Sequence, residues 1–90
     1  MTKSEIVAKV AKKSGIERAA VAIIVDEFMT TVKDAMADGE NVYLRGFGTF
    51  EIKQKAARYQ NIKQGTERLF VPEHSEPKFK PCLEFKEMVK

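Results

Sequence analysis

Five cations gather in one short segment of this 90-residue chain. Residues 53–68 carry five Lys or Arg against one acidic residue, a net charge of +4. Residues 1–52 have a net charge of −1 and residues 69–90 a net charge of 0, so the formal charge of +3 originates in this segment. Because each Lys or Arg can neutralise a phosphate, the segment predicts binding to a nucleic acid. The cations are Lys53, Lys55, Arg58, Lys63 and Arg68.

An apolar residue, Ile62, lies in the middle of this polar segment, next to Asn61. Folding gives no reason for an apolar residue at that point. One interpretation is a wedge that enters a base step from the minor groove and kinks the duplex, with Asn61 touching minor-groove acceptors. The other is a lone exposed isoleucine, which is common on protein surfaces. The residues alone leave both interpretations open.

Residues that perform catalysis or hold metals are sparse. His74 is the only histidine and Cys82 the only cysteine, and they form neither a metal-ligand spacing nor a nucleophile–base pair. The run Gly46-Phe47-Gly48 lacks phosphate-loop spacing. We therefore expect no enzyme activity, no cofactor, no metal and no small-molecule substrate.

Other features favour a cytoplasmic protein. The single cysteine fits a reducing compartment. The polar N-terminus shows no signal peptide, and no apolar run is long enough to span a membrane. We expect no membrane partner.

Two helices are predicted in the first part of the chain. Thr2 and Glu5 have capping-box spacing, with Glu5 reaching back, and Ser14-Gly15 ends the first helix. A broad apolar stripe from Val21 to Met36 predicts a longer second helix. The first helix is too short to cover this stripe, so we interpret it as a subunit interface, with an ordinary core face as the alternative.

The period of the apolar residues changes from 3.6 to 2 at Asn41. A hairpin that turns at Gly46-Phe47-Gly48 and resumes at Phe50 and Ile52 is predicted. After Ile52 the apolar face disappears, which predicts a two-stranded ribbon projecting from the body and returning through Glu67–Val71.

Two further elements follow this ribbon. Segment 77–81 is expected to be an edge strand or a stiff connector. Cys82, Phe85, Met88 and Val89 predict a short terminal helix whose apolar face covers the sheet.

A dimer unites the small core, the wide stripe and the single ribbon. Two ribbons related by a two-fold axis can embrace double-stranded DNA from both sides, whereas one is a poor clamp. A homodimer is the simplest arrangement, and a heterodimer stays open.

The chain resembles the bacterial HU and integration host factor proteins over essentially its full length. The matching runs are Thr2–Glu5, Lys13–Gly15, Gly39, Arg45–Phe50, Ala56–Arg58, Pro72 and Pro77–Pro81. The resemblance implies a single α+β domain over residues 1–90. It implies an intertwined dimer with a helical base, a small antiparallel sheet and a protruding two-stranded β-ribbon arm at approximately residues 53–75. The implied function is histone-like: bending and compacting DNA from the minor groove in the nucleoid, with little sequence specificity.

The resemblance also implies roles for individual residues. Lys53, Lys55 and Arg58 match arm residues that contact phosphates, and Lys3 and Lys80 match flank contacts on the body. The family's arm tip usually reads Arg-Asn-Pro, with the proline as wedge. The chain departs from this pattern: Asn61-Ile62 takes the Asn-Pro position after a one-residue shift, whereas without a gap Lys63 faces the proline. We prefer Ile62, because a lysine cannot stack into an apolar step. The expected DNA-binding residues are Lys3, Arg45, Lys53, Lys55, Arg58, Tyr59, Asn61, Ile62, Lys63, Arg68 and Lys80.

Three rival functions are weighed. A site-specific DNA-bending subunit of the integration-host type stays open, because Arg45 before Gly-Phe-Gly is similar to one subunit of that pair. A helix-turn-helix regulator is disfavoured, because Asp26, Glu27 and Asp34 on the second helix would repel phosphates. A protein-binding module, in which the ribbon adds a strand to a partner, predicts little salt dependence.

Overall fold

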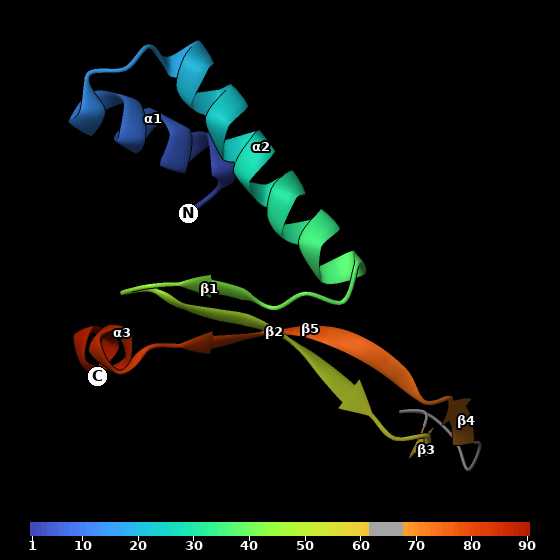
Figure 1. Ribbon diagram of the computed structural model, residues 1–90. Coiled ribbons are helices and arrows are strands. Elements are labelled where there is room, and N and C mark those ends of the chain that lie inside the picture. Colours follow the sequence, from blue (N-terminus) through green and yellow to red (C-terminus); the bar gives the residue numbers. More distant parts are fainter. Residues whose placement is uncertain (62–67) are drawn as a thin grey trace. The chain divides into compact units, whose positions relative to one another are not determined.

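The computed structural model describes residues 1–61 and 68–90, so the expectations for Ile62 and Lys63 lie outside the described residues. The chain divides into a helical unit, Met1–Ala35, and a sheet unit, Met36–Lys90. Helices and antiparallel strands confirm the α+β class (Figure 1). The elements are α1 (Lys3–Ser14), α2 (Arg18–Ala37), β1 (Val42–Leu44), β2 (Gly48–Lys55), β3 (Arg58–Asn61), β4 (Arg68–Val71), β5 (His74–Pro81) and α3 (Leu83–Val89).

Helix α1 begins and ends where the sequence predicts. The Glu5 backbone N–H donates to Thr2 Oγ1 at 3.3 Å, and the Thr2 hydroxyl donates to the Glu5 carboxylate at 3.3 Å. At the other end the Gly15 N–H donates to the Ala11 carbonyl at 3.0 Å. Both termini of the helix are therefore capped by residues of the chain itself.

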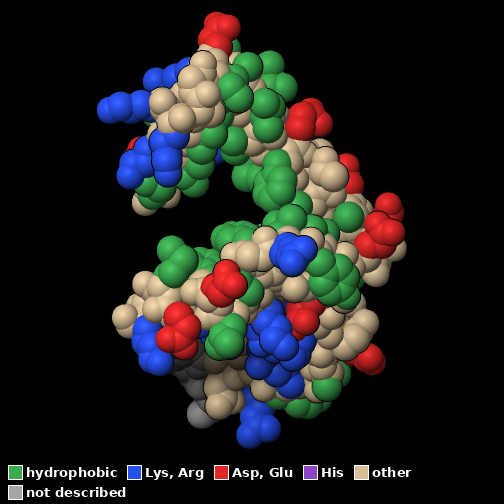
Figure 2. Space-filling view, turned by 60° about the vertical axis from the view of Figure 1, so that its left-hand side comes forward, with side chains coloured by type: hydrophobic (Ala, Val, Ile, Leu, Met, Phe, Trp, Pro, Cys, Tyr) green, Lys and Arg blue, Asp and Glu red, His purple; other side chains and the backbone are tan. Residues whose placement is uncertain are grey.

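Helix α2 carries the predicted stripe and leaves much of it uncovered. Val7 and Val21, 4% and 2% exposed, are the buried hydrophobic residues among those described. Ile24 and Phe28, on the same stripe as Val21, are exposed. Figure 2 shows hydrophobic side chains (green) at the surface of both units. Such exposure is what a subunit interface requires of a single chain. No helix among the described residues is long and apolar enough to span a membrane.

The sheet unit is built on three antiparallel strands in the order β1-β2-β5. Phe79 on β5 is the centre of its aromatic cluster, because its ring centroid lies 4.9 Å from those of both Phe47 and Phe50. Phe85 on α3 stacks on Phe47, with centroids 5.4 Å apart. Helix α3 is thereby fixed to one end of the sheet.

Two glycines shape the turn between β1 and β2. Gly46 has a φ of 83°, a conformation that side-chain-bearing residues rarely adopt. Gly48 is buried, and a Cβ at this position would lie 2.5 Å from the Lys80 carbonyl oxygen. The predicted hairpin is confirmed, and glycine at position 48 permits the close approach of β2 and β5.

Two expectations for the C-terminal part need correction. Strand β5 begins at His74 instead of Pro77 and pairs with β2 from Lys55↔His74 to Gly48↔Pro81. The acidic residues before Pro77 concealed its start, because such residues are uncommon in strands. In the terminal helix only Phe85 packs on the aromatic cluster, whereas Met88 and Val89 are exposed. A helix of two turns presents too narrow a side to bury all three.

Candidate nucleic-acid interface

The projecting ribbon forms because β2 and β5 continue past the apolar part of the sheet. Lys53–Lys55 pair with His74–Glu76, and beyond them β3 and β4 form a separate two-stranded sheet. This ribbon lies at the end of the sheet unit remote from α3 (Figure 1). We call its described residues, 53–61 and 68–76, the arm. The predicted ribbon is confirmed for these residues.

The arm carries its cations on both faces. Lys53 and Lys55 are two residues apart on β2 and share one face with their partners Glu76 and His74. On β3–β4, Arg58 lies opposite Val71.

Arg68 lies opposite Asn61, an odd number of residues along β3 from Arg58. Arg58 and Arg68 therefore belong to opposite faces. All four arm cations are exposed. A ribbon charged on both faces can meet phosphates on either side of it.

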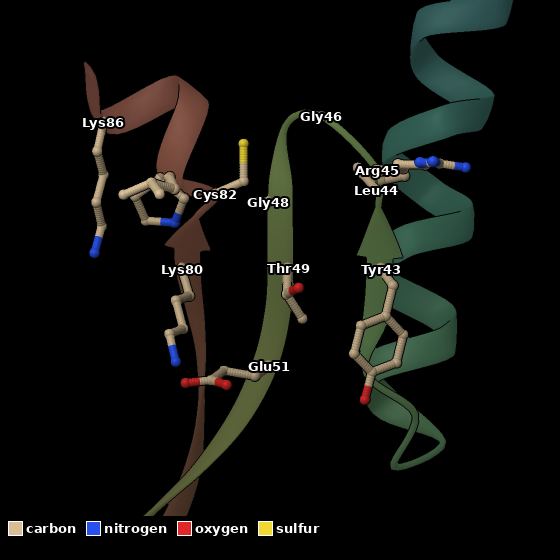
Figure 3. Close-up of a pocket in the computed structure, with 12 residues that line it drawn as sticks. Tyr43, Leu44, Arg45, Gly46, Gly48, Thr49, Glu51, Lys80, Cys82 and Lys86 are labelled. Carbon is tan, nitrogen blue, oxygen red and sulfur yellow. The ribbon is translucent and has the colours of Figure 1, made fainter. Parts of the chain in front are cut away.

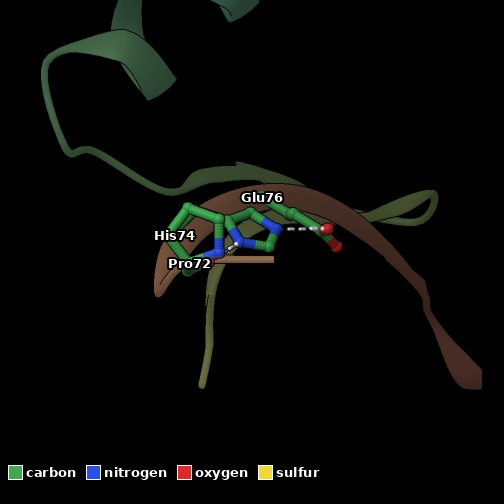
Figure 4. Close-up of polar contacts among 3 residues, drawn as sticks. All are labelled: Pro72, His74 and Glu76. Atoms are coloured by element: carbon green, nitrogen blue, oxygen red, sulfur yellow. Dashed lines mark hydrogen bonds and ion pairs between the residues drawn. The ribbon is translucent and has the colours of Figure 1, made fainter. Parts of the chain in front are cut away.

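A hydrogen-bonded histidine lies at the base of the arm. His74 Nδ1 lies 2.8 Å from the Pro72 carbonyl oxygen, and Nε2 lies 2.7 Å from Glu76 Oε1 (Figure 4). The hydrogen bond to Glu76 raises the pKa of His74 above its ordinary value, and the Pro72 carbonyl adds to this rise. The same bond lowers the pKa of Glu76, and Lys55 and Arg58 act in the same direction. The sequence interpretation of His74 as a surface histidine missed this arrangement.

A charged groove opens on the sheet face opposite the aromatic cluster. Tyr43, Thr49 and Lys80 occupy neighbouring positions on β1, β2 and β5. The Lys80 side chain points along the groove toward Glu51, with Arg45 at the turn after β1 (Figure 3). The groove's polar and charged lining residues are Tyr43, Arg45, Thr49, Glu51, Lys80 and Lys86. Arg45 and Lys80, both expected to bind DNA, therefore belong to one surface.

Sequence reasoning missed two cations near this groove. Lys78 lies two residues before Lys80 on β5, so strand alternation already places both on one face. Lys86 reaches the groove from α3. Its location depends on how Phe85 packs, which no local pattern reveals.

Lys3 belongs to the helical unit and is engaged there. Its Nζ lies 2.9 Å from Asp26 Oδ1, and both side chains are more than half exposed. An exposed pair of this kind contributes little to stability. Lys3 can therefore exchange this partner for a phosphate at little cost.

The described residues do not form a group of three or more His, Cys, Asp or Glu that could hold a metal ion. Cys82 is a half-buried free thiol that precedes α3.

Comparison with known proteins gives consistent matches over the whole chain. The family model described as bacterial DNA-binding protein matches residues 1–90. The chain is 42% identical to DNA-binding protein HU of Thermotoga maritima, over all of both chains. It is 39% identical to the SPbeta prophage-derived DNA-binding protein HU 2 of Bacillus subtilis, over all of this chain and 98% of that protein. Its fold matches an Anabaena HU–DNA cocrystal structure with a TM-score of 0.91 and 29% identity, covering 99% of this chain and 97% of the other.

Proposed function

Because the chain belongs to the bacterial DNA-binding protein family, we propose that it is a histone-like architectural protein. It bends and compacts double-stranded DNA by minor-groove binding of its arms, with little sequence specificity. The observation that carries this proposal is the arm itself, a ribbon with exposed cations on both faces. Lys53, Lys55 and Arg58 supply charge for phosphates without being set out to read base edges, which favours affinity over sequence preference.

The proposed DNA-binding surface has two parts. On the arm, the phosphate and groove contacts are Lys53, Lys55, Arg58, Tyr59, Asn61 and Arg68. On the body, Lys3, Arg45 and Lys80 bind the flanks of the site. Ile62 as the wedge and Lys63 as a further contact remain predictions, because they lie outside the described residues.

The functional unit is proposed to be a homodimer in which residues 1–90 of each chain form one domain. The exposed part of the α2 stripe, with Ile24 and Phe28, supports this, because it is apolar surface that the single chain does not bury. A two-fold axis gives two arms that grip one duplex from both sides. Pairing with a different chain of the same family is the alternative.

Two other functions are less well supported. The relatives named above are HU proteins, which disfavours a site-specific subunit of the integration-host type. They are DNA-binding proteins by name and not enzymes, so we propose no catalytic activity. DNA compaction places the protein in the nucleoid of a bacterial cytoplasm.

A salt titration of binding tests the proposal. Affinity is measured for a mixed-sequence duplex and for several defined duplexes at a series of salt concentrations. Four to eight neutralised phosphates per dimer correspond to a slope of about −4 to −7 in log affinity against log salt. Similar affinities for all duplexes with such a slope are expected. A flat salt profile would reject the arm as a DNA clamp, and one strongly preferred sequence would favour the site-specific alternative.

A further inference from the structure

Two aromatic side chains lie exposed on the arm, where no core covers them. Tyr59 on β3 pairs directly with Phe70 on β4, and their ring centroids are 5.3 Å apart at an interplanar angle of 58°. Tyr59 is 65% exposed and Phe70 is 53% exposed. Each ring therefore keeps much of its surface in contact with solvent in the isolated chain. Large apolar surface on a thin ribbon is unfavourable in water unless a partner covers it.

The neighbouring positions give this aromatic surface a defined chemistry. Asn61 and Arg68 form the next register pair on the same face, two residues along each strand. One ribbon face thus combines two aromatic rings, an amide and a guanidinium group. The opposite face carries Gln60 and Leu69.

This combination matches what an unpaired nucleobase needs. Aromatic rings provide a surface on which a base can stack, an arginine binds the adjoining phosphate, and an amide can bond to the exposed base edge. In an intact duplex the base faces are hidden by stacking, so ring surfaces cannot use them. Only a strand with unpaired bases offers this contact.

We infer that the face formed by Tyr59, Phe70, Asn61 and Arg68 is a stacking site for an unpaired base in a single-stranded gap of DNA. The inference rests on the proposed function, because the arm must first reach DNA. It adds a contact that does not depend on a wedge at the arm tip. Tyr59 and Phe70 supply the base-stacking surface, and Arg68 fixes the backbone beside it.

A pair of matched variants tests the inference. Phe70→Thr removes one ring and keeps a residue that favours strands. Leu69→Thr makes the same kind of change at the next position, 57% exposed on the opposite face. Both variants and the wild type are measured against an intact duplex and the same duplex with a short gap. A 2-aminopurine in the gap reports stacking through quenching of its fluorescence.

The wild type is expected to bind the gapped duplex more tightly than the intact one and to quench the probe. Phe70→Thr should lower affinity for gapped DNA about tenfold, a typical effect of losing one stacked base, and keep duplex affinity within about twofold. Phe70→Tyr should retain quenching. Equal losses on both DNAs, or the same losses for Leu69→Thr, would show that the pair only stabilises the ribbon and would overturn the inference. Duplex binding without a gap preference would overturn it too and leave the proposed function intact, whereas failure to bind either DNA would overturn both.

Discussion

His74 Nε2 lies 2.7 Å from a carboxylate oxygen of Glu76, where β5 begins at the base of the arm. The other ring nitrogen lies 2.8 Å from the Pro72 carbonyl oxygen. Both ring nitrogens thus have an oxygen acceptor. Only the protonated imidazole can donate to both of them at once, so the site favours the charged ring. The positive charges of Lys55 and Arg58 surround the pair, and Arg58 opposes protonation of His74.

The pair should stabilise the arm over a limited pH window. The raised pKa of His74 means that its contribution is fully present below the ordinary value of 6.5 and is lost as pH rises through the folded-state pKa. The lowered pKa of Glu76 means that its contribution is present above 4.5 and is lost as pH falls through its folded-state pKa. Stabilisation should therefore be greatest between these two ordinary values. An NMR titration of the His74 ring should give a pKa above 6.5.

Glu76→Gln is the matched change for this prediction, because it keeps a side-chain oxygen but removes the charge. It should bring the pKa of His74 back toward its ordinary value. An unchanged titration midpoint in this variant would show that Glu76 is not the cause of the rise.

Gly48→Ala should destabilise the fold. A Cβ there would lie 2.5 Å from the Lys80 carbonyl oxygen and 2.7 Å from the Phe79 ring, and the backbone oxygen cannot move without disturbing the β2–β5 pairing. Overpacking of this kind costs about 1–3 kcal/mol of unfolding free energy. Denaturant unfolding measures it. Thr49→Ala, one residue along the same strand, is the control and should cost less, so equal losses would argue against a steric cause.

Much of this fold is predictable from local sequence patterns. Thr2 and Glu5 reveal the start of α1, and the Gly46–Gly48 turn reveals the first hairpin, because caps and tight turns depend on adjacent residues. The start of β5 at His74 was missed, because it depends on pairing with Lys55, distant in sequence.

The candidate site divides in the same way. The charge of the arm and the alternation at Lys78 and Lys80 can be read along the chain. The proximity of Lys86 to Arg45 requires α3 to dock through Phe85, and the pairing of Tyr59 with Phe70 requires the register of two strands. Such relationships arise from tertiary structure and leave no periodic signal.

Release of Lys3 from its ion pair should strengthen DNA binding. Asp26→Ala removes the partner that lies 2.9 Å from the Lys3 ammonium group, so Lys3 is free to contact a phosphate. The stability cost should stay below about 1 kcal/mol, because both side chains are exposed. DNA affinity at low salt should rise by up to about fivefold. Glu27→Ala removes the same charge one residue along and is the control; an equal rise there would attribute the effect to net charge alone.

Ile62→Ala tests the wedge that the sequence predicts at the arm tip. A wedge bends DNA by unstacking one base step, whereas affinity depends mainly on phosphate contacts. The variant should therefore bend a duplex less, with a smaller change in affinity. Energy transfer between dyes at the two duplex ends measures the bend. Lys63→Ala is the comparison, and loss of bending in that variant alone would assign the wedge position to residue 63.

Neutralising cations at the base of the arm should change the salt dependence of binding in a countable way. Lys53 and Lys55 are exposed on one face of the arm, and each is proposed to neutralise a phosphate. Losing one phosphate contact reduces the slope of log affinity against log salt by about 0.9. The double variant Lys53→Ala/Lys55→Ala should therefore lower the slope by about 1.8 per arm, and by twice that amount in a two-armed homodimer. Lys9→Ala/Lys12→Ala on α1 removes the same charge away from the arm and should leave the slope nearly unchanged. Equal slopes for the two double variants would mean that only the total charge of the protein matters, and the arm would lose its place as the main phosphate-binding element.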